Sequence, residues 1–207
     1  KKSYSRNYID SMFGGFENSN LYFENKKIRE DVFFDKLNLK LKKVQSNDNV
    51  LYFFGNGASS AFANHMALDF SKNGNITARS LSDSSLLTAL SNDYSFDDAM
   101  VEFLKIQKPQ KNDLVITISS SGNSRNIVKV LDFCKKNSID SLSFSGLKSD
   151  NKSIPLSKHS LHVPMKTYGM VECMHQVYLH LILDKFMNIE EWNKKDVQDM
   201  NASNFKL

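Results

Sequence analysis

A run of serine side chains stands where the sequence predicts that a strand ends and a helix begins. Residues 119–124 read Ser-Ser-Ser-Gly-Asn-Ser, between apolar residues that end at Ile118 and a helical pattern that starts near Ile127. The free N–H groups and the dipole at a helix start attract an anion, and serine hydroxyls add hydrogen-bond donors. No lysine follows at P-loop spacing, which argues against a nucleoside triphosphatase. A serine-rich turn that only caps the helix would show the same local pattern, so both interpretations stay open here.

A second turn of this kind occurs earlier in the chain. Residues 55–60 read Gly-Asn-Gly-Ala-Ser-Ser and follow the apolar run Val50–Phe54. Glycine lets a ligand approach the backbone closely. A dinucleotide-binding fingerprint would have glycine at position 60, where this chain has serine, and an acidic residue at the end of the next strand, which is absent. The turn therefore gives little support to a dinucleotide-binding domain.

Two ionisable residues share one face of the helix that follows this turn. His65 and Asp69 are four residues apart, a spacing at which side chains on a helix meet. The pair could hold a metal ion or transfer protons. An ordinary surface contact is the more frequent meaning of such a pair, and the spacing alone does not decide.

Three further ionisable residues interrupt the apolar helical pattern at 168–187. They are Glu172, His175 and His180. A straight helix separates Glu172 from His180 by about 12 Å along its axis, so one helix cannot easily bring both to a single ion. Either the helix begins irregularly, or a neighbouring chain completes the site. From spacing alone, an ordinary polar stripe is the simpler interpretation.

Short apolar runs alternate with helical patterns along most of the chain. The expected strands are residues 50–54, 76–81, 114–119, 141–145 and 161–164. The expected helices are residues 21–46, 58–73, 84–92, 96–107 and 168–187, with one more from the serine segment to about residue 137. This alternation predicts a parallel sheet covered on both faces, with ligands beyond the carboxyl ends of its strands. Those ends point to the turns at 55–59, 82–84 and 119–124.

Length and composition favour one globular domain with appendages. The chain has 207 residues, 41% of them hydrophobic, and its net charge is only +4. The basic residues are scattered, so we expect no nucleic-acid partner. No apolar run is long enough for a membrane span, so we expect no membrane partner, and no signal peptide is visible. Two isolated cysteines suggest a reducing, cytoplasmic compartment. Three parts are expected. Residues 1–46 are an N-terminal arm (1–20) and the helix that follows it, residues 47–188 are an α/β domain, and residues 189–207 are a polar tail.

Four segments in this order resemble the sugar isomerase (SIS) domain family, and within it the phosphoheptose isomerases. They are FFGNGASSAFANHMALDF, SDSSLLTALSNDYSFDD, ITISSSGNSRNIVKVL and VECMHQVYLHLIL. The resemblance covers about residues 50–187. It implies a three-layer α/β sandwich around a five-stranded parallel sheet of flavodoxin-like type, preceded by an N-terminal helical extension. It also implies a homotetramer with shared active sites.

The resemblance implies a role for individual residues. Those that match substrate-binding positions are Asn56, Gly57, Ala58, Asn92, Asp93, Ser119, Ser120, Ser121, Ser124 and Glu172. Those that match zinc-binding positions are His65, Asp69, Glu172 and His180. Asp69 and His180 fall at the catalytic positions. The implied reaction converts sedoheptulose 7-phosphate to D-glycero-D-manno-heptose 7-phosphate, which feeds nucleotide-activated heptose for capsule or lipopolysaccharide.

The chain departs from the family pattern at three places. Asp69 is one methylene shorter than the usual glutamate, and Glu172 replaces a typical glutamine. The loop at 70–76 is short and lacks the usual basic residue, and an acidic residue before Glu172 is missing. Both side-chain replacements leave carboxylates, which are better zinc ligands than an amide. The three departures bear on the identity of the sugar more than on the phosphate site, and two alternatives remain. One is an isomerase of another sugar phosphate. The other is a non-catalytic protein that binds a sugar phosphate or a protein partner such as a replication initiator.

Overall fold

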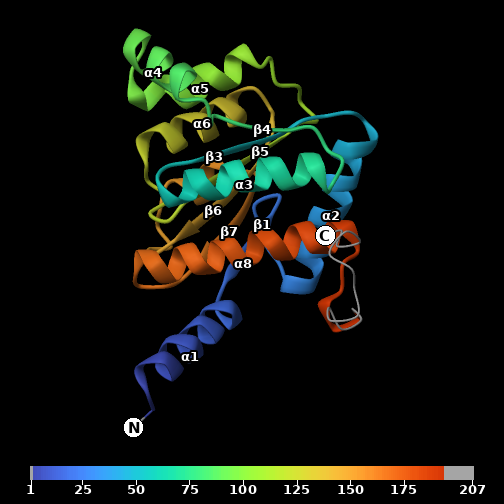
Figure 1. Cartoon of the computed structure of the whole chain (residues 1–207), viewed down its shortest axis with the longest axis vertical. Coiled ribbons are helices and arrows are strands. Elements are labelled where there is room, and N and C mark those ends of the chain that lie inside the picture. The colour runs from blue at the N-terminus through green and yellow to red at the C-terminus, as the bar shows by residue number, and fades with distance from the viewer. Residues whose placement is uncertain (1, 194–207) are drawn as a thin grey trace, which may run out of the picture.

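A seven-stranded sheet forms the centre of the computed structural model, which describes residues 2–193. The strand order is β2-β1-β7-β6-β5-β3-β4. Five strands run parallel: β3 (Leu51–Gly55), β4 (Ala78–Ser80), β5 (Leu114–Ser119), β6 (Asp140–Gly146) and β7 (His159–Val163). They correspond to the five strands predicted from the apolar runs. Figure 1 shows them between two layers of helices, as the alternation of strands and helices predicts.

Two antiparallel strands extend the sheet beyond the five that were expected. They are β1 (Asn20–Phe23), which pairs with β7, and β2 (Lys26–Lys27), which pairs with β1. The prediction of one helix over 21–46 is therefore wrong at its start, and the helix α2 spans Glu30–Ser46. Glu24 and Asn25 have positive φ angles of 50° and 62°. Such a pair of left-handed residues makes a tight hairpin turn and ends any helix there.

The expected loose arm at 1–20 is also corrected, because most of it forms the helix α1 (Tyr4–Glu17). The Ser3 side chain caps the helix by accepting a hydrogen bond from the Arg6 N–H. Gly15 is the only buried residue of α1, and a Cβ there would lie 2.6 Å from the sulfur of Met174. The glycine therefore serves a close contact with α8 and does not break the helix. Figure 1 shows α1 projecting from the body of the protein.

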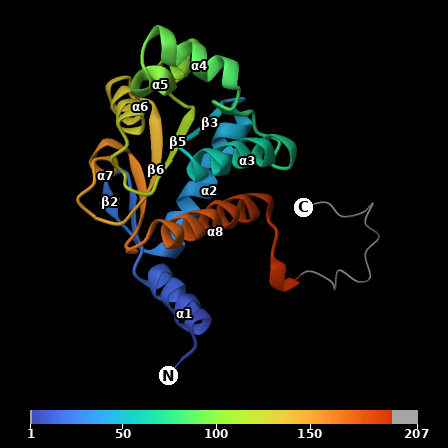
Figure 2. The same cartoon turned by 60° about the vertical axis from the view of Figure 1, so that its left-hand side comes forward.

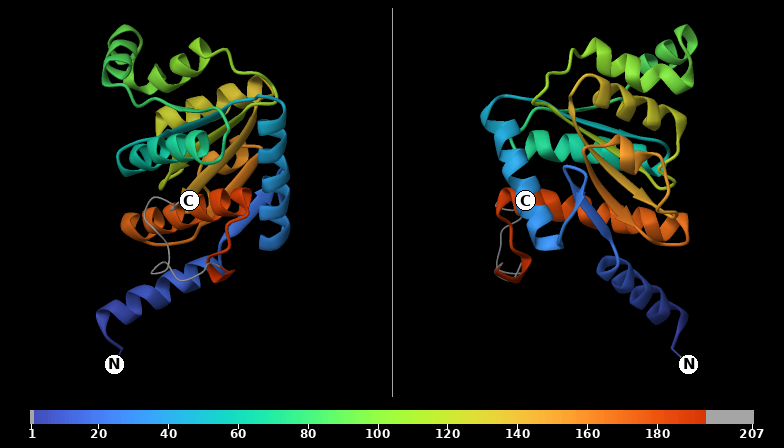
Figure 3. Two further views of the ribbon diagram at one scale, coloured as in Figure 1. Left: turned by 45° about the vertical axis from the view of Figure 1, so that its right-hand side comes forward. Right: turned by 180° about the vertical axis from the view of Figure 1, so that it is seen from behind.

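The helices divide between the two faces of the sheet (Figures 2 and 3). One face carries α2, α3 (Ala58–Lys72) and α8 (Tyr168–Met187). The other carries α4 (Ser84–Asp93), α5 (Phe96–Ile106), α6 (Arg125–Lys136) and the short α7 (Ser153–Leu156). Side chains of β5 alternate between the two cores, with Ile116 and Ile118 on the α8 side and Val115 on the α6 side. A three-layer sandwich results.

Two of the three expected ligand turns lie side by side, because β3 and β5 are neighbours in the sheet. Gly57 follows β3 with a φ of +56°, and Gly122 follows β5 with a φ of +63°. Both are left-handed conformations that favour glycine.

The chain ends, for the part that the structure describes, in a short 3-10 turn at Glu191–Asn193. The rest of the expected polar tail, residues 194–207, lies outside the described residues. Among residues 2–193, each helix is too short or too polar to cross a bilayer.

Candidate active site

A small pocket of about 140 Å³ lies at the carboxyl ends of β3 and β5. We call it the serine pocket. The residues that line it are Asn56, Ser59, Ile118, Ser119, Ser120, Ser121, Ser124, Tyr168 and Glu172. They come from the end of β5, from the loop after it, and from the starts of three helices, α3, α6 and α8. Because each helix start carries a partial positive charge, their convergence makes the pocket attractive to an anion.

Hydrogen-bond donors remain available in the serine pocket. The Ser124 side chain makes no capping bond to α6, and its hydroxyl lies 3.3 Å from that of Ser119. Within residues 2–193, the N–H groups of Arg125 and Asn126 have no hydrogen-bond partner, as expected for the first turn of a helix. None of the lining residues is Lys or Arg. A bound phosphate would therefore be held by hydroxyls, amide N–H groups and helix dipoles.

A pair of asparagines joins the two turns that form the serine pocket. The amides of Asn56 and Asn126 donate to each other, both at 2.9 Å, and Asn126 also accepts from the Ile127 N–H. The sequence prediction included Asn56 but missed Asn126, because nothing in the local pattern says that its side chain turns back toward β3. Ser59, Tyr168 and Gln176 were also missed, because the local sequence pattern does not show which side chains the fold brings to the site.

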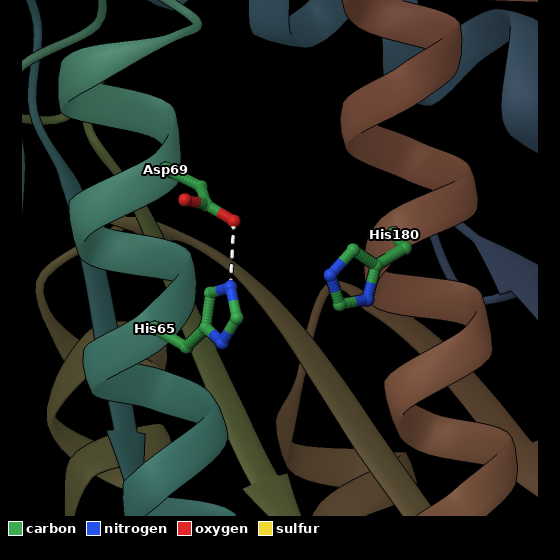
Figure 4. A group of neighbouring side chains, drawn as sticks. All are labelled: His65, Asp69 and His180. Carbon is green, nitrogen blue, oxygen red and sulfur yellow. Dashed lines mark ion pairs between the residues drawn. The ribbon is translucent and has the colours of Figure 1, made fainter. Parts of the chain in front are cut away.

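A second group of side chains lies where α3 faces α8 (Figure 4). His65, Asp69 and His180 each offer one possible ligand atom within 4.8 Å of the others. His65 Nε2 lies 2.8 Å from a carboxylate oxygen of Asp69, and the rings of His65 and His180 are 5.4 Å apart at 85°. Asp69 is buried, whereas half of the His65 side chain is exposed. The group is therefore open to solvent on one side.

Gln176 orients the ring of His180 from the preceding turn of α8. His180 Nδ1 lies 3.0 Å from the Gln176 main-chain oxygen and 3.1 Å from its side-chain amide. When Nδ1–H donates to the main-chain oxygen, Nε2 keeps a lone pair and faces Asp69 and His65 (Figure 4). Two imidazoles and one carboxylate with a fourth position open are a donor set that suits a catalytic zinc ion.

Glu172 does not join these three residues within one chain. It lies two turns earlier on α8 and lines the serine pocket. The helix is continuous from Tyr168 to Met187, so the separation of about 12 Å between Glu172 and His180 persists. Within a single chain, the four expected ligands therefore do not meet at one ion. His65, Asp69 and His180 lie together, and Glu172 lies in the serine pocket.

Gly57 and Ala58 stand between the pocket residues Asn56 and Ser59, whereas Asn92, Asp93 and His175 lie outside both groups. Asn92 and Asp93 are exposed at the end of α4, where the Asn92 amide donates to Asp93 at 3.0 Å. His175 is fully buried, and its Nε2 lies 3.1 Å from the main-chain oxygen of Ser145. Burial lowers the pKa of His175 to about 4, so this histidine is neutral at ordinary pH. His175 lies outside the group of His65, Asp69 and His180, and its contact with Ser145 packs α8 against the end of β6.

Comparison with known proteins identifies the family. The SIS domain profile matches residues 29–145, more than half of the chain. Phosphoheptose isomerase 2 of Campylobacter jejuni subsp. jejuni is 33% identical over 150 residues, which are 70% of this chain and 74% of that relative. The chain belongs to the SIS domain family. The resemblance drawn from the four sequence segments is confirmed.

Several solved structures share the fold of this chain. The structure of phosphoheptose isomerase GmhA from Neisseria gonorrhoeae has a TM-score of 0.72 at 21% identity, over 88% of this chain and 97% of that one. The Vibrio vulnificus NanR protein complexed with ManNAc-6P has a TM-score of 0.59 at 16% identity, over 91% of this chain and 61% of that one. This fold thus occurs both in a phosphoheptose isomerase and in a protein solved as a complex with ManNAc-6P.

We expect Ser121→Ala to weaken binding of a sugar phosphate about tenfold or more, because a hydrogen bond to a charged group is worth about 1.5–3 kcal/mol. Isothermal titration calorimetry with inorganic phosphate measures the change in the dissociation constant of the phosphate group. Ser85→Ala, an exposed serine on α4, is the matched control and should bind as the unaltered protein does. Equal affinity of the Ser121 and Ser85 variants would contradict a phosphate site in the serine pocket.

Proposed function

We propose that this SIS-domain protein is an aldose–ketose isomerase that converts sedoheptulose 7-phosphate to D-glycero-D-manno-heptose 7-phosphate. One observation carries the proposal: the serine pocket and the group His65, Asp69 and His180 lie along the same two helices, α3 and α8. The named activity of the relative from Campylobacter supports the choice of substrate. The product would enter the synthesis of nucleotide-activated heptose for capsule or lipopolysaccharide in the cytoplasm.

The spacing along the two helices suits a seven-carbon substrate. Ser59 precedes His65 by six residues on α3, and Glu172 precedes His180 by eight on α8. At 1.5 Å per residue these spacings are about 9 and 12 Å. An extended seven-carbon chain with C–C bonds of about 1.5 Å is about 8 Å long before its phosphate is added. A phosphate in the serine pocket would therefore leave C1 and C2 beside Asp69 and His180.

Asp69 and His180 would carry out the proton transfers. The Asp69 carboxylate takes a proton from C1 of the ketose, and the C–H electron pair forms the C1–C2 double bond of an enediol as His180, in its imidazolium form, gives its Nε2 proton to O2. Asp69 then returns its proton to C2, while the O1 hydroxyl gives its proton to His180 and becomes the aldehyde oxygen. Each group ends in the protonation state in which it began. Glu172, in the serine pocket, would accept a hydrogen bond from a sugar hydroxyl.

The residues present fit a zinc ion, which we propose as the cofactor. His65 and Asp69 would hold it, together with His180 while the His180 ring is neutral, and this set gives two neutral donors and one negative charge. When bound, the ion supplies a Lewis acid that polarises the substrate oxygens. Glu172 could become a fourth ligand only from a neighbouring subunit, because it lies too far along α8 in its own chain.

A non-catalytic sugar-phosphate binder is the main rival. The NanR structure with ManNAc-6P has the same fold. A binder would need the serine pocket alone, and it would have no use for a buried carboxylate bracketed by two histidines. The group on α3 and α8 therefore favours an enzyme. An isomerase of another sugar phosphate stays an alternative that a substrate comparison resolves.

The protein should convert sedoheptulose 7-phosphate faster than fructose 6-phosphate, as followed by NMR of the aldose product.

Asp69→Asn should lower kcat at least a hundredfold, because a positioned proton-transfer group contributes about 10²–10⁴-fold. Asp132→Asn, which alters a surface ion pair on α6, is the matched control. His65→Ala should lose stoichiometric zinc in elemental analysis. Full activity of Asp69→Asn would contradict the role of Asp69 in proton transfer. Full activity of protein from which a chelator has removed zinc would contradict zinc as the cofactor.

We also propose a homotetramer in which copies of the chain share active sites. α1 projects from the body, and exposed apolar side chains, among them Ile9 and Phe13, lie on one side of it. An isolated helix of this length is marginal in water, so a second copy packed on it would stabilise it. Exposed Asn92 and Asp93 would then reach a site from a neighbouring copy, since they do not reach one in their own chain.

Sedimentation should give a tetramer at assay concentration. Phe13→Glu should shift the protein toward smaller species, because it places a charge on the apolar side of α1. Ser11→Glu, on the opposite side of the same helix, should leave the assembly unchanged. A fully active monomer would overturn the proposal of shared sites.

A further inference from the structure

The serine loop, residues 119–124, rests on a segment far from it in the sequence. The main-chain N–H and the hydroxyl of Ser153 both donate to the Gly122 oxygen, at 3.0 and 2.8 Å. The Lys152 N–H donates to the Asn123 side chain at 3.0 Å. Residues 151–153, which lead into α7, therefore form a support beneath the loop. Residues 151–153 were not among the site residues expected from the sequence, and they take no part in the proposed reaction.

Asn151 packs directly against Gly122 of the loop. It is 2% exposed, and its side chain occupies the space that a Cβ on Gly122 would need. Gly122 also has a φ of +63°, so both the backbone angle and the neighbouring amide require glycine there. The course of the loop at Gly122 is thus set by the position of the Asn151 side chain.

All the hydrogen-bonding capacity of the Asn151 amide is used. Its nitrogen donates to the Lys148 oxygen at 2.9 Å and to the Ser145 hydroxyl at 3.2 Å. Its oxygen accepts from the N–H groups of Ser153 and Ile154, at 3.2 and 3.4 Å. An amide with two donors and two acceptors engaged has one position and one orientation.

Ser145, at the end of β6, joins this support to the rest of the site. Its hydroxyl lies 3.3 Å from His162 Nδ1 on β7, and its main-chain oxygen accepts from His175 of α8 at 3.1 Å. The next residue, Gly146, donates its N–H to the Ser120 oxygen at 3.0 Å. The same strand end therefore fixes the serine loop and the helix that carries Glu172 and His180.

We propose that Asn151 is a positioning residue for phosphate binding: it holds the serine loop in the shape that binds the anion, at a fixed place relative to α8. The inference rests on the proposed phosphate site in the serine pocket. Asn151 lies beneath the loop and does not line the pocket, so it acts through Gly122 and not by touching the substrate. Binding of phosphate should therefore depend on a buried side chain that never contacts it.

Two substitutions test the role at different cost to the fold. Asn151→Ala removes the whole contact, whereas Ser153→Ala removes only the hydroxyl that donates to the Gly122 oxygen. We expect Asn151→Ala to raise both the dissociation constant for inorganic phosphate and the KM for the sugar phosphate about tenfold. Ser153→Ala should raise both about threefold. Neither variant should change kcat or zinc content by more than twofold, because Asp69 and His180 are untouched.

Asn49→Ala is the matched control. Asn49 is half-buried at the amino end of β3 and donates to Asp113, so its loss should lower the melting temperature without changing phosphate affinity. If the Asn151 and Ser153 variants both bind phosphate within twofold of the unaltered protein while Ser121→Ala binds weakly, the positioning role is wrong and the phosphate site stands. If Ser121→Ala also binds normally, the phosphate site and the positioning role are both wrong.

Discussion

The packing of α3 against α8 is the constraint on which the rest of the site depends. Both helices begin at the serine pocket and run away from it side by side, as Figure 1 shows. Their contact includes Phe70 and Phe186, whose ring centroids are 6.1 Å apart. Each helix therefore contributes to the pocket near its start and, about two turns later, to the group His65, Asp69 and His180. The helical rise fixes the distance between an anion-binding end and a proton-transfer end.

The charge distribution along this pair of helices differs between the two ends. The serine pocket has hydroxyls, amide N–H groups and converging helix starts, with one carboxylate from Glu172 and no basic side chain among its lining residues. The other end holds a buried carboxylate between two imidazoles. A doubly charged phosphate suits the first arrangement, and a cation or a proton in transit suits the second. A sugar phosphate offers both partners in one molecule.

The sequence predicted those parts of the fold that depend on local patterns. The apolar run Leu114–Ser119 becomes β5 at its predicted bounds, because a strand buried on both faces needs continuous apolar residues. The hairpin at 20–27 was mistaken for the start of a helix, since Leu21 and Ile28 fit a helical spacing as well as a strand. Its turn depends on the left-handed backbone of Glu24 and Asn25, which composition alone does not reveal. Side chains that act at a distance, such as Asn126 and Asn151, could not be found without the packing. The division of Glu172 from His180, by contrast, follows from the rise of one helix and was foreseen.

A crystal structure of the protein with sedoheptulose 7-phosphate bound would show whether the sugar phosphate lies along α3 and α8. We expect the phosphate between the Ser121 and Ser124 hydroxyls, with C1 and C2 of the sugar beside Asp69 and His180 and the carbon chain extended along the two helices. A phosphate bound outside the serine pocket, or a sugar whose C1 and C2 lie away from Asp69 and His180, would contradict this expectation.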